Sequence, residues 1–250
     1  MEIRLMRHAT FFLTVGGVRL LVDPVLSPAG AMSPIDNSPN PLRNPLVGLP
    51  INESELAAVD GILCTHTHRD HFDAAAAERL PKELPVFCQP ADEAKLHGFG
   101  FSQVTAVHDK AEWRGVSLVR TGGRHGSGEM AEKMGPVSGY VLRSSGEPVL
   151  YIAGDTVWCP EVAAALEEHR PDVIVLFAGA AQFLSGGPIT MDTADIAAVC
   201  AAAPAARVVV VHMEAFNHCL LTRPLLQTFL DREGLAGRVT VPADGETAKL

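Results

Sequence analysis

Three things are scarce or missing in this sequence of 250 residues: cysteine, long hydrophobic runs and an excess of basic side chains. The five cysteines are widely spread and form no CxxC pair, so we expect no disulfide framework and predict a cytoplasmic protein. The longest apolar runs, at residues 173–181 and 208–211, are too short to cross a bilayer. The N-terminal sequence MEIRLMRHAT lacks both the apolar stretch and the cleavage site of a signal peptide. We therefore expect no membrane insertion.

The basic charge is too low for a protein that binds along a nucleic acid. The chain has 20 Lys and Arg against 29 Asp and Glu, which gives a net charge of −9, whereas phosphate-backbone binding normally needs a basic face. The apolar fraction of 47% can bury a sizeable core and excludes wholesale disorder. The sequence thus predicts a globular protein whose partner is a small-molecule substrate and not nucleic acid. A homo-oligomer is compatible with it.

Strands and helices are predicted to alternate along the chain. After a first strand that ends near His8, strands are expected at residues 11–14, 18–22, 61–65, 85–89, 104–107, 116–120, 137–142, 149–153, 173–177, 207–211 and 238–241. Helices are expected at residues 73–80, 92–96, 160–169, 193–203 and 224–233, the first capped by Asp73 and the third with Pro160 in its first turn. The stretch 27–52 contains prolines at 28, 34, 39, 41, 45 and 50, so we predict a loop there, either passive or a lid over a site.

Two segments of the chain resemble each other. Residues 10–24 and 139–156 both read as hairpins whose second strand leads to an aspartate, Asp23 in one and Asp155 in the other. This similarity favours two related halves, each a mixed sheet with helices on one face, packed sheet against sheet. No linker divides them.

The most informative motif is HTHRDH at residues 66–71, directly after an apolar strand. Imidazole nitrogens together with a carboxylate suit Zn, Fe or Mn better than Mg or Ca. His66 and His68 point the same way in an extended or tightly turned loop, whereas Asp70 and His71 can turn toward a second centre. One short loop can therefore begin two metal sites, and this spacing disfavours the alternative of a polar cap on a strand.

Further candidate ligands follow later strands. His125 lies in a glycine-rich loop, Asp155 follows the strand at 149–153, and His212 follows the strand at 207–211. Each alone would more often be an ordinary loop residue. Their shared position beyond the carboxyl ends of apolar strands favours a site, because open sheets gather functional groups at that edge.

Taken together, these motifs resemble those of the metallo-β-lactamase-fold hydrolases over nearly the whole chain. The matching residues are His66, His68, Asp70, His71, His125, Asp155 and His212. The opening RHATFFLTVGGVRLLVDP, the Gly154-Asp155-Thr156 turn and the closing VPADGE resemble the branch of metal-dependent hydrolases related to the ascorbate-6-phosphate lactonases. The set is specific for the fold and poorly specific for the substrate.

This resemblance implies an α/β protein, an αββα four-layer sandwich of two mixed sheets flanked by helices, as a single domain over residues 1–250. The metals would lie at one edge between the sheets. His66, His68 and His125 would hold the first ion, Asp70, His71 and His212 the second, and Asp155 would bridge them. The implied cofactors are two divalent ions, Zn²⁺ first, with Mn²⁺ or Fe²⁺ as alternatives.

The function that follows is a dinuclear metal-dependent hydrolase acting on a small ester, lactone or phosphate-ester-like substrate. A hydroxide between the metals would attack, with Asp70 both ligating a metal and orienting the hydroxide. One alternative is a phosphodiesterase of the same fold, with a nucleotide or phospholipid substrate. Another is a catalytically silent metal-binding protein, which the loss of a ligand would support, and no ligand is lost.

Other polar residues are predicted to lie near this centre. His218 is a candidate for contacting the substrate or donating a proton, with a structural hydrogen-bonding role as the alternative. His8 carries the same ambiguity with structure favoured, and Asp23 is interpreted as a supporting carboxylate beside the ligands. His97, His108 and His169 are expected to take no part.

Overall fold

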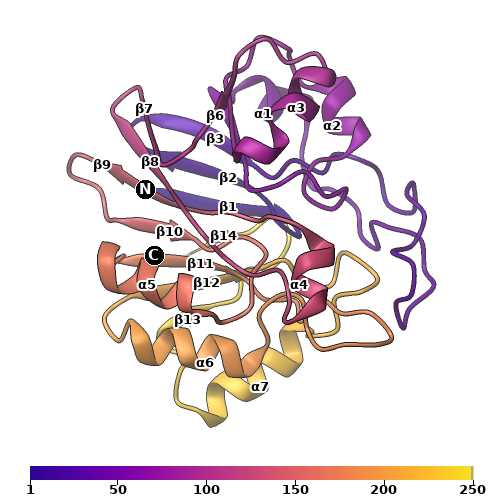
Figure 1. The fold of residues 1–250 in the computed structure, drawn as a ribbon, viewed down its shortest axis with the longest axis vertical. Helices are drawn as coiled ribbons and strands as arrows, with labels where there is room; N and C mark the ends of the chain where they lie inside the picture. The colour runs from indigo at the N-terminus through magenta and orange to yellow at the C-terminus, as the bar shows by residue number, and fades with distance from the viewer. Residues whose placement is uncertain (249) are drawn as a thin grey trace.

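Two mixed β-sheets face each other in the computed structural model, which describes residues 1–248 and 250 (Figure 1). Within these residues, the first sheet has seven strands in the spatial order β14 (Thr247–Ala248), β1 (Glu2–Arg7), β2 (Thr10–Val15), β3 (Val18–Val22), β4 (Gly61–Cys64), β5 (Val86–Cys88) and β6 (Val104–Ala106). The second sheet, over the same described residues, has seven in the order β13 (Val239–Thr240), β12 (Arg207–Val211), β11 (Val173–Phe177), β10 (Leu150–Ile152), β9 (Gly139–Ser144), β8 (Val116–Thr121) and β7 (Lys110–Trp113).

The two sheets repeat one plan. The antiparallel hairpin of β2 and β3 continues into the parallel strands β4, β5 and β6. The antiparallel hairpin of β9 and β10 likewise continues into the parallel strands β11, β12 and β13. The prediction of two mixed sheets built on similar halves is therefore confirmed.

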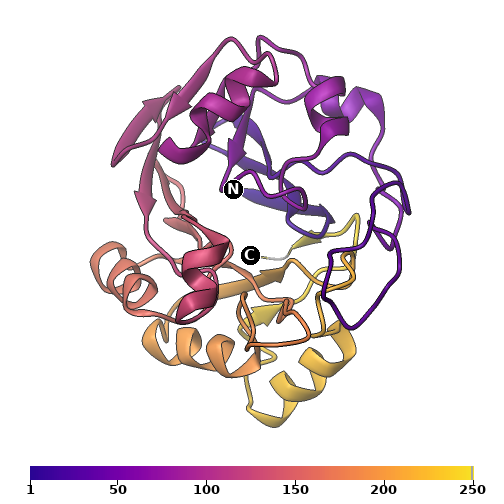
Figure 2. The same ribbon diagram turned by 45° about the vertical axis from the view of Figure 1, so that its right-hand side comes forward.

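Helices cover the outer faces of both sheets, as Figure 2 shows from the side. The described helices are α1 (Glu53–Ala57), α2 (Ala74–Arg79), α3 (Glu93–Gly98) after the short 3₁₀ turn η1 (Pro90–Asp92), α4 (Glu129–Met134), α5 (Pro160–His169), α6 (Thr193–Ala202) and α7 (Arg223–Arg232). Apolar residues of α1, α2 and α3 pack on the first sheet, and those of α5, α6 and α7 pack on the second. The layers are therefore αββα, which confirms the predicted fold class. None of the described helices is long and apolar enough to span a membrane.

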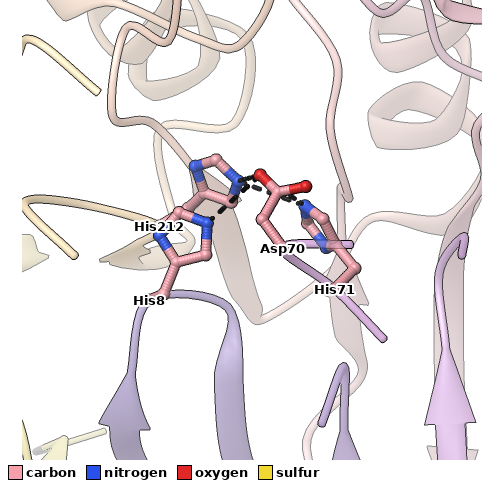
Figure 3. Close-up of side chains that lie close together, drawn as sticks. All are labelled: His8, Asp70, His71 and His212. Carbon is pink, nitrogen blue, oxygen red and sulfur yellow. Dashed lines mark hydrogen bonds and ion pairs between the residues drawn. The ribbon is translucent and has the colours of Figure 1, made fainter. Parts of the chain in front are cut away.

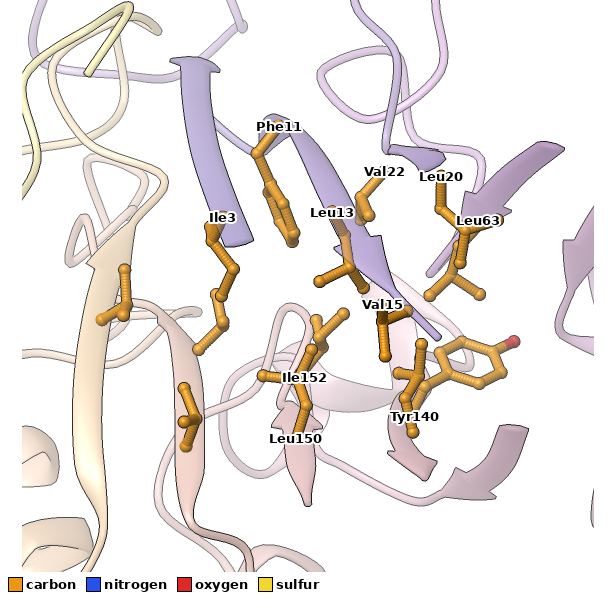
Figure 4. Packing of buried hydrophobic residues seen from close by; sticks show 14 of the residues in the cluster. Ile3, Phe11, Leu13, Val15, Leu20, Val22, Leu63, Tyr140, Leu150 and Ile152 are labelled. Atoms are coloured by element: carbon orange, nitrogen blue, oxygen red, sulfur yellow. The ribbon is translucent and has the colours of Figure 1, made fainter. Parts of the chain in front are cut away.

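The largest part of the core lies between the sheets. Side chains alternate across a strand, so every second residue of a central strand points inward. Figure 4 shows Phe11, Leu13 and Val15 of β2 facing Leu150 and Ile152 of β10, all fully buried. At roughly 1.5–3 kcal/mol per buried aliphatic or aromatic side chain, this layer is a main source of folding free energy. It holds the two sheets rigidly against each other, which fixes the loops at their shared edge.

Most of the predicted elements form close to their expected bounds. The strands at 173–177 and 207–211 and the helix at 160–169 match residue for residue. Asp73 caps α2 by accepting a hydrogen bond from the Ala76 N–H at 2.8 Å, as predicted. The strand at 238–241 is the last one that the sequence predicts, but β14 follows it and pairs with β1. The last described strand therefore lies in the first sheet and not in the second.

Candidate metal centre

All seven predicted ligands converge at one edge between the sheets. The donor atoms form three groups in which every atom lies within 4.8 Å of the others: His66, His68 and His125; His66, His71 and Asp155; and His8, Asp70, His71 and His212. Four of the predicted ligands come from the loop after β4, and the others come from the ends of β8, β10 and β12. His8, which we expected to be structural, joins the third group.

Close backbone contacts bring the later ligands into place. Gly154, directly before Asp155, has φ +70°, and a Cβ there would lie 2.5 Å from the Ser138 carbonyl oxygen. A Cβ on Gly179 would lie 2.1 Å from the carbonyl oxygen of His212. Both positions therefore exclude any side chain. These glycines allow the strand ends of the second sheet to approach the centre closely.

The three histidines of the first group point their ring nitrogens at one place. His66 Nε2 lies 3.0 Å from His68 Nδ1, and His125 Nε2 lies 3.4 Å from Asp155 Oδ2. Burial lowers the pKa of both His66 and His125, so these imidazoles are neutral at neutral pH. A neutral ring nitrogen carries the lone pair that a metal ion needs.

The third group surrounds the carboxylate of Asp70 (Figure 3). Asp70 Oδ2 lies 3.7 Å from His212 Nε2 and 3.9 Å from His71 Nε2, and these two nitrogens are 3.1 Å apart. Burial by itself would raise the pKa of Asp70, but the histidines around it hold that pKa well below its usual range. The carboxylate is therefore ionised.

Asp155 lies between the first and the third group. Its Oδ2 is 3.2 Å from His71 Nε2 and 3.4 Å from His125 Nε2, and its Oδ1 is 3.3 Å from His212 Nε2. The Oδ1 atom is buried and has no hydrogen-bond partner. One carboxylate thus faces donors of both groups, and its role as a bridging ligand stays a prediction.

This arrangement fits divalent metal ions. Two ligands of a tetrahedral ion with bonds of about 2.1 Å lie roughly 3.4 Å apart, and the separations around Asp155 are close to that. The charge also fits. Burial by itself lowers the pKa of His212, but the groups around this histidine, Asp155 first among them, raise that pKa to about 10. The carboxylates of the cluster therefore favour a positive charge beside them. Nitrogen and carboxylate donors in this combination suit zinc, iron or manganese.

Two of the predicted ligands, His71 and His125, each have a hydrogen-bond partner on Nδ1 that orients the ring. Asp23 accepts a hydrogen bond at 2.8 Å from His71 Nδ1 and another at 2.7 Å from the Thr65 hydroxyl. His125 Nδ1 donates to the Ile189 carbonyl at 2.8 Å. A donor at Nδ1 leaves Nε2 free to bind a metal. Asp23 therefore contacts a predicted ligand, and its role as a supporting carboxylate stays a prediction.

A cleft of about 200 Å³ opens beside the cluster. Its polar side is formed by His68, Arg69, Asp70, His125 and His218, and its apolar side by Ile35, Met134, Phe183 and Ile189. His218 Nε2 lies 3.6 Å from Asp70 Oδ2, and its buried Nδ1 has no hydrogen-bond partner. Burial lowers the pKa of His218 to about 4, so the ring is neutral and can offer one N–H and one lone pair. It belongs to none of the three donor groups.

The loop at 27–52 forms one wall of this cleft through Ile35. Asn217, a buried neighbour of His218, fastens the loop with hydrogen bonds on every polar atom of its side chain. Its Oδ1 accepts from the Ile35 N–H at 2.9 Å and from Asn44 Nδ2 at 2.7 Å. Arg69 holds the loop from the other side, donating to the Ser33 hydroxyl at 3.0 Å. The sequence did not single out Asn217.

The comparison with known proteins agrees with this geometry. The family described as beta-lactamase superfamily domain matches residues 18–213. The chain belongs to this superfamily. It is 38% identical to the UPF0173 protein YddR of Bacillus subtilis, over 99% of each chain. A relative called a UPF0173 metal-dependent hydrolase, from Cereibacter sphaeroides, is 29% identical over 77% of this chain and 76% of its own.

Two solved structures are similar over essentially the whole chain. An isothiocyanate hydrolase from Delia radicum gut bacteria is 36% identical with a TM-score of 0.96, covering 100% of this chain and 99% of that one. A possible metal-dependent hydrolase from Veillonella parvula is 35% identical with a TM-score of 0.97 and the same coverage. This chain is therefore a metal-dependent hydrolase. The narrower resemblance to the ascorbate-6-phosphate lactonases stays a prediction.

Proposed function

We propose that this chain is a dinuclear hydrolase of small substrates that carry an apolar group. His66, His68 and His125 would hold one ion, Asp70, His71 and His212 the other, and Asp155 would bind both. Zn²⁺ is the first candidate, with Mn²⁺ or Fe²⁺ as alternatives. The contact of Asp155 with donors of both groups carries this proposal, because seven donors exceed what one tetrahedral ion uses. The five free cysteines, all in the described part of the chain, fit the predicted cytoplasm.

The favoured substrate class is a small isothiocyanate. Support comes from the similar isothiocyanate hydrolase and from the cleft, whose apolar wall of Ile35, Met134, Phe183 and Ile189 suits the hydrocarbon group of R–N=C=S. Water would add to the central carbon and the C–N bond would break, so that R–N=C=S and water become R–NH₂ and carbonyl sulfide. The products contain every atom of the reactants.

The chain's own residues would then divide the work. Bound divalent ions would lower the pKa of water and stabilise the negative charge that develops on attack. Asp70 Oδ2 lies near Nε2 of His71, His212 and His218. It would accept a hydrogen bond from the attacking water and orient it. His218 lines the cleft with an unpartnered Nδ1, which places it to meet the departing nitrogen. The apolar wall would exclude bulk water from the substrate.

A small carboxylic ester or lactone is the second candidate. It rests on the resemblance of the motifs at residues 7–24, 154–156 and 241–246 to the lactonase branch. The bound ions would polarise the carbonyl group of such a substrate in the same way. A phosphodiester is disfavoured, because Arg69 is the one cationic side chain among the described residues that line the cleft, and its terminal nitrogens already donate to Ser33 and Pro34.

The test is a substrate panel on Zn²⁺-loaded protein. Allyl isothiocyanate, a γ-lactone, a p-nitrophenyl ester and bis(p-nitrophenyl) phosphate are compared by kcat/KM, with metal content measured on the same sample. We expect the isothiocyanate to be the best substrate by at least tenfold and two ions per chain. Preference for the phosphodiester, or one ion per chain at full activity, would contradict the proposal.

A further inference from the structure

His8 is a buried histidine at the centre that the proposed ligand set does not use. Its side chain is fully buried, and neither ring nitrogen makes a hydrogen bond. Nε2 points at Asp70, 3.5 Å from Oδ2, beside His71 and His212 (Figure 3). A buried polar nitrogen without a partner costs folding free energy, so its presence needs a compensating role.

The backbone of His8 aims the ring at this place. The residue follows β1 and has φ +59°, a left-handed conformation that histidine tolerates better than most side chains. Its carbonyl oxygen accepts a hydrogen bond from the His212 N–H at 2.9 Å. The His8 ring lies 3.7 Å from the His212 ring and 4.6 Å from the Phe216 ring, centroid to centroid. The turn after β1 in the first sheet is thus joined to a ligand from the second sheet.

We propose that His8 is a positioning residue of the second metal site, whose Nε2–H is directed at Asp70 and holds that carboxylate toward His71 and His212. This inference rests on the proposed dinuclear function. Ligating carboxylates are commonly held by a hydrogen bond from a neighbour, and loss of such a neighbour typically lowers metal affinity ten- to hundredfold. His8 has the reach and the burial for that role, and packing against His212 and Phe216 prevents its ring from turning away.

A matched pair of variants tests the inference. His8→Gln keeps an N–H near the position of Nε2, whereas His8→Met has a similar length and no donor. Both place an unbranched side chain in the same left-handed conformation, so their backbone strain is equal. Zn²⁺ binding is measured by equilibrium dialysis for each of the two ions. Thermal unfolding in chelator shows whether the metal-free variants fold equally well.

We expect His8→Met to bind the second ion ten- to hundredfold more weakly than His8→Gln, with first-ion affinities within twofold of each other. Equal affinities of the two variants for the second ion would overturn the inference. So would an equal loss of both ions in His8→Met with a lower unfolding temperature in chelator, because that result marks a purely structural role. If the unchanged protein binds only one ion, the dinuclear proposal itself fails, which separates the two results.

Discussion

At the residue scale, Asp155 is the buried carboxylate whose oxygens face ring nitrogens of His71, His125 and His212. Asp155→Ala removes the contact that the two proposed ligand groups share, together with carboxylate oxygens 3.2–3.4 Å from three ring nitrogens. We expect the variant to lose at least one ion per chain and more than a hundredfold in kcat/KM, since residues that only support ligands already cost ten- to hundredfold. Metal analysis and kinetics on the same sample measure both effects.

A histidine outside the centre provides the control. His97 is exposed, and its Nδ1 hydrogen-bonds the Phe101 carbonyl oxygen at 3.0 Å at the end of α3. His97→Ala should keep both ions and full turnover. Unchanged metal content in Asp155→Ala would contradict the bridging role.

The role proposed for His218 concerns the substrate and not metal binding. It lines the cleft beside Asp70 but belongs to none of the donor groups. We expect His218→Ala to retain both ions and to lower turnover roughly ten- to thousandfold, the usual worth of a positioned proton donor or charge stabiliser. Kinetics of the metal-loaded variant, normalised to folded protein, measure this. A lower unfolding temperature with normal turnover would instead mark His218 as structural.

Side-chain type along the sequence predicted which histidines and aspartates gather at the centre. It did not predict the residues that hold the surrounding loops and rings in place. The HTHRDH motif and the later strand-end residues His125, Asp155 and His212 carry their chemistry in their side-chain type, and the structure brings them together. Asn217 carries no such signal, because its importance comes from contacts with loop atoms far away in the sequence, such as those of Ile35, 182 positions before it. His8 was visible as a histidine after a strand, but only the pairing of the two sheets places it beside His212.

At the scale of elements, the proline-rich loop at 27–52 is fastened by hydrogen bonds beside the cleft, which it lines through Ile35. Asn217 and Arg69, each next to a residue of the centre, bind it from two sides. Asn217→Ala would remove the acceptor of the Ile35 N–H and of Asn44 Nδ2, at about 1–3 kcal/mol for a buried group left unpaired. We expect KM to rise about tenfold with kcat and metal content nearly unchanged, because Ile35 would no longer be held in the cleft. Steady-state kinetics with the preferred substrate measure this.

Replacing residues 32–46 with a short Gly/Ser linker is the stronger form of the same change. This variant should change substrate choice or raise KM further while both ions remain. An unchanged KM in both variants would show that the loop is passive, the other interpretation that its prolines allowed.

The elements that the sequence did not predict are short or lie at edges. α4 has no buried residue, so it lacks the apolar periodicity that identifies a helix. β7 has the sequence KAEW, with two charges in four residues, and among the described strands it pairs only with β8. α1 does carry a capping box between Asn52 and Glu55, but it directly follows the proline-rich loop and spans five residues. Strong periodicity thus predicted the central elements, and tertiary contacts decided the rest.

At the scale of the whole molecule, the proposed centre joins the two sheets. His66, His68, Asp70 and His71 follow β4 of the first sheet, whereas His125, Asp155 and His212 follow strands of the second. The sheets pack through a continuous apolar core, but at this edge the contact is made by ionised and polar groups. Bound cations would therefore stabilise the packing of the halves as well as the site.

Removal of metal should accordingly lower the unfolding temperature. Ligand present at a hundred times its Kd stabilises a protein by about 2.7 kcal/mol, which corresponds to roughly 5–10 °C for a chain of this length. Scanning calorimetry of Zn²⁺-loaded protein, with and without excess chelator, measures the shift. Asp155→Ala, which should already have lost metal, is expected to shift much less, because its ligand groups no longer share an anion. An equal shift in both proteins would place the stabilising ion elsewhere, since the carboxylate that contacts both sheets' ligands would then contribute nothing to its binding.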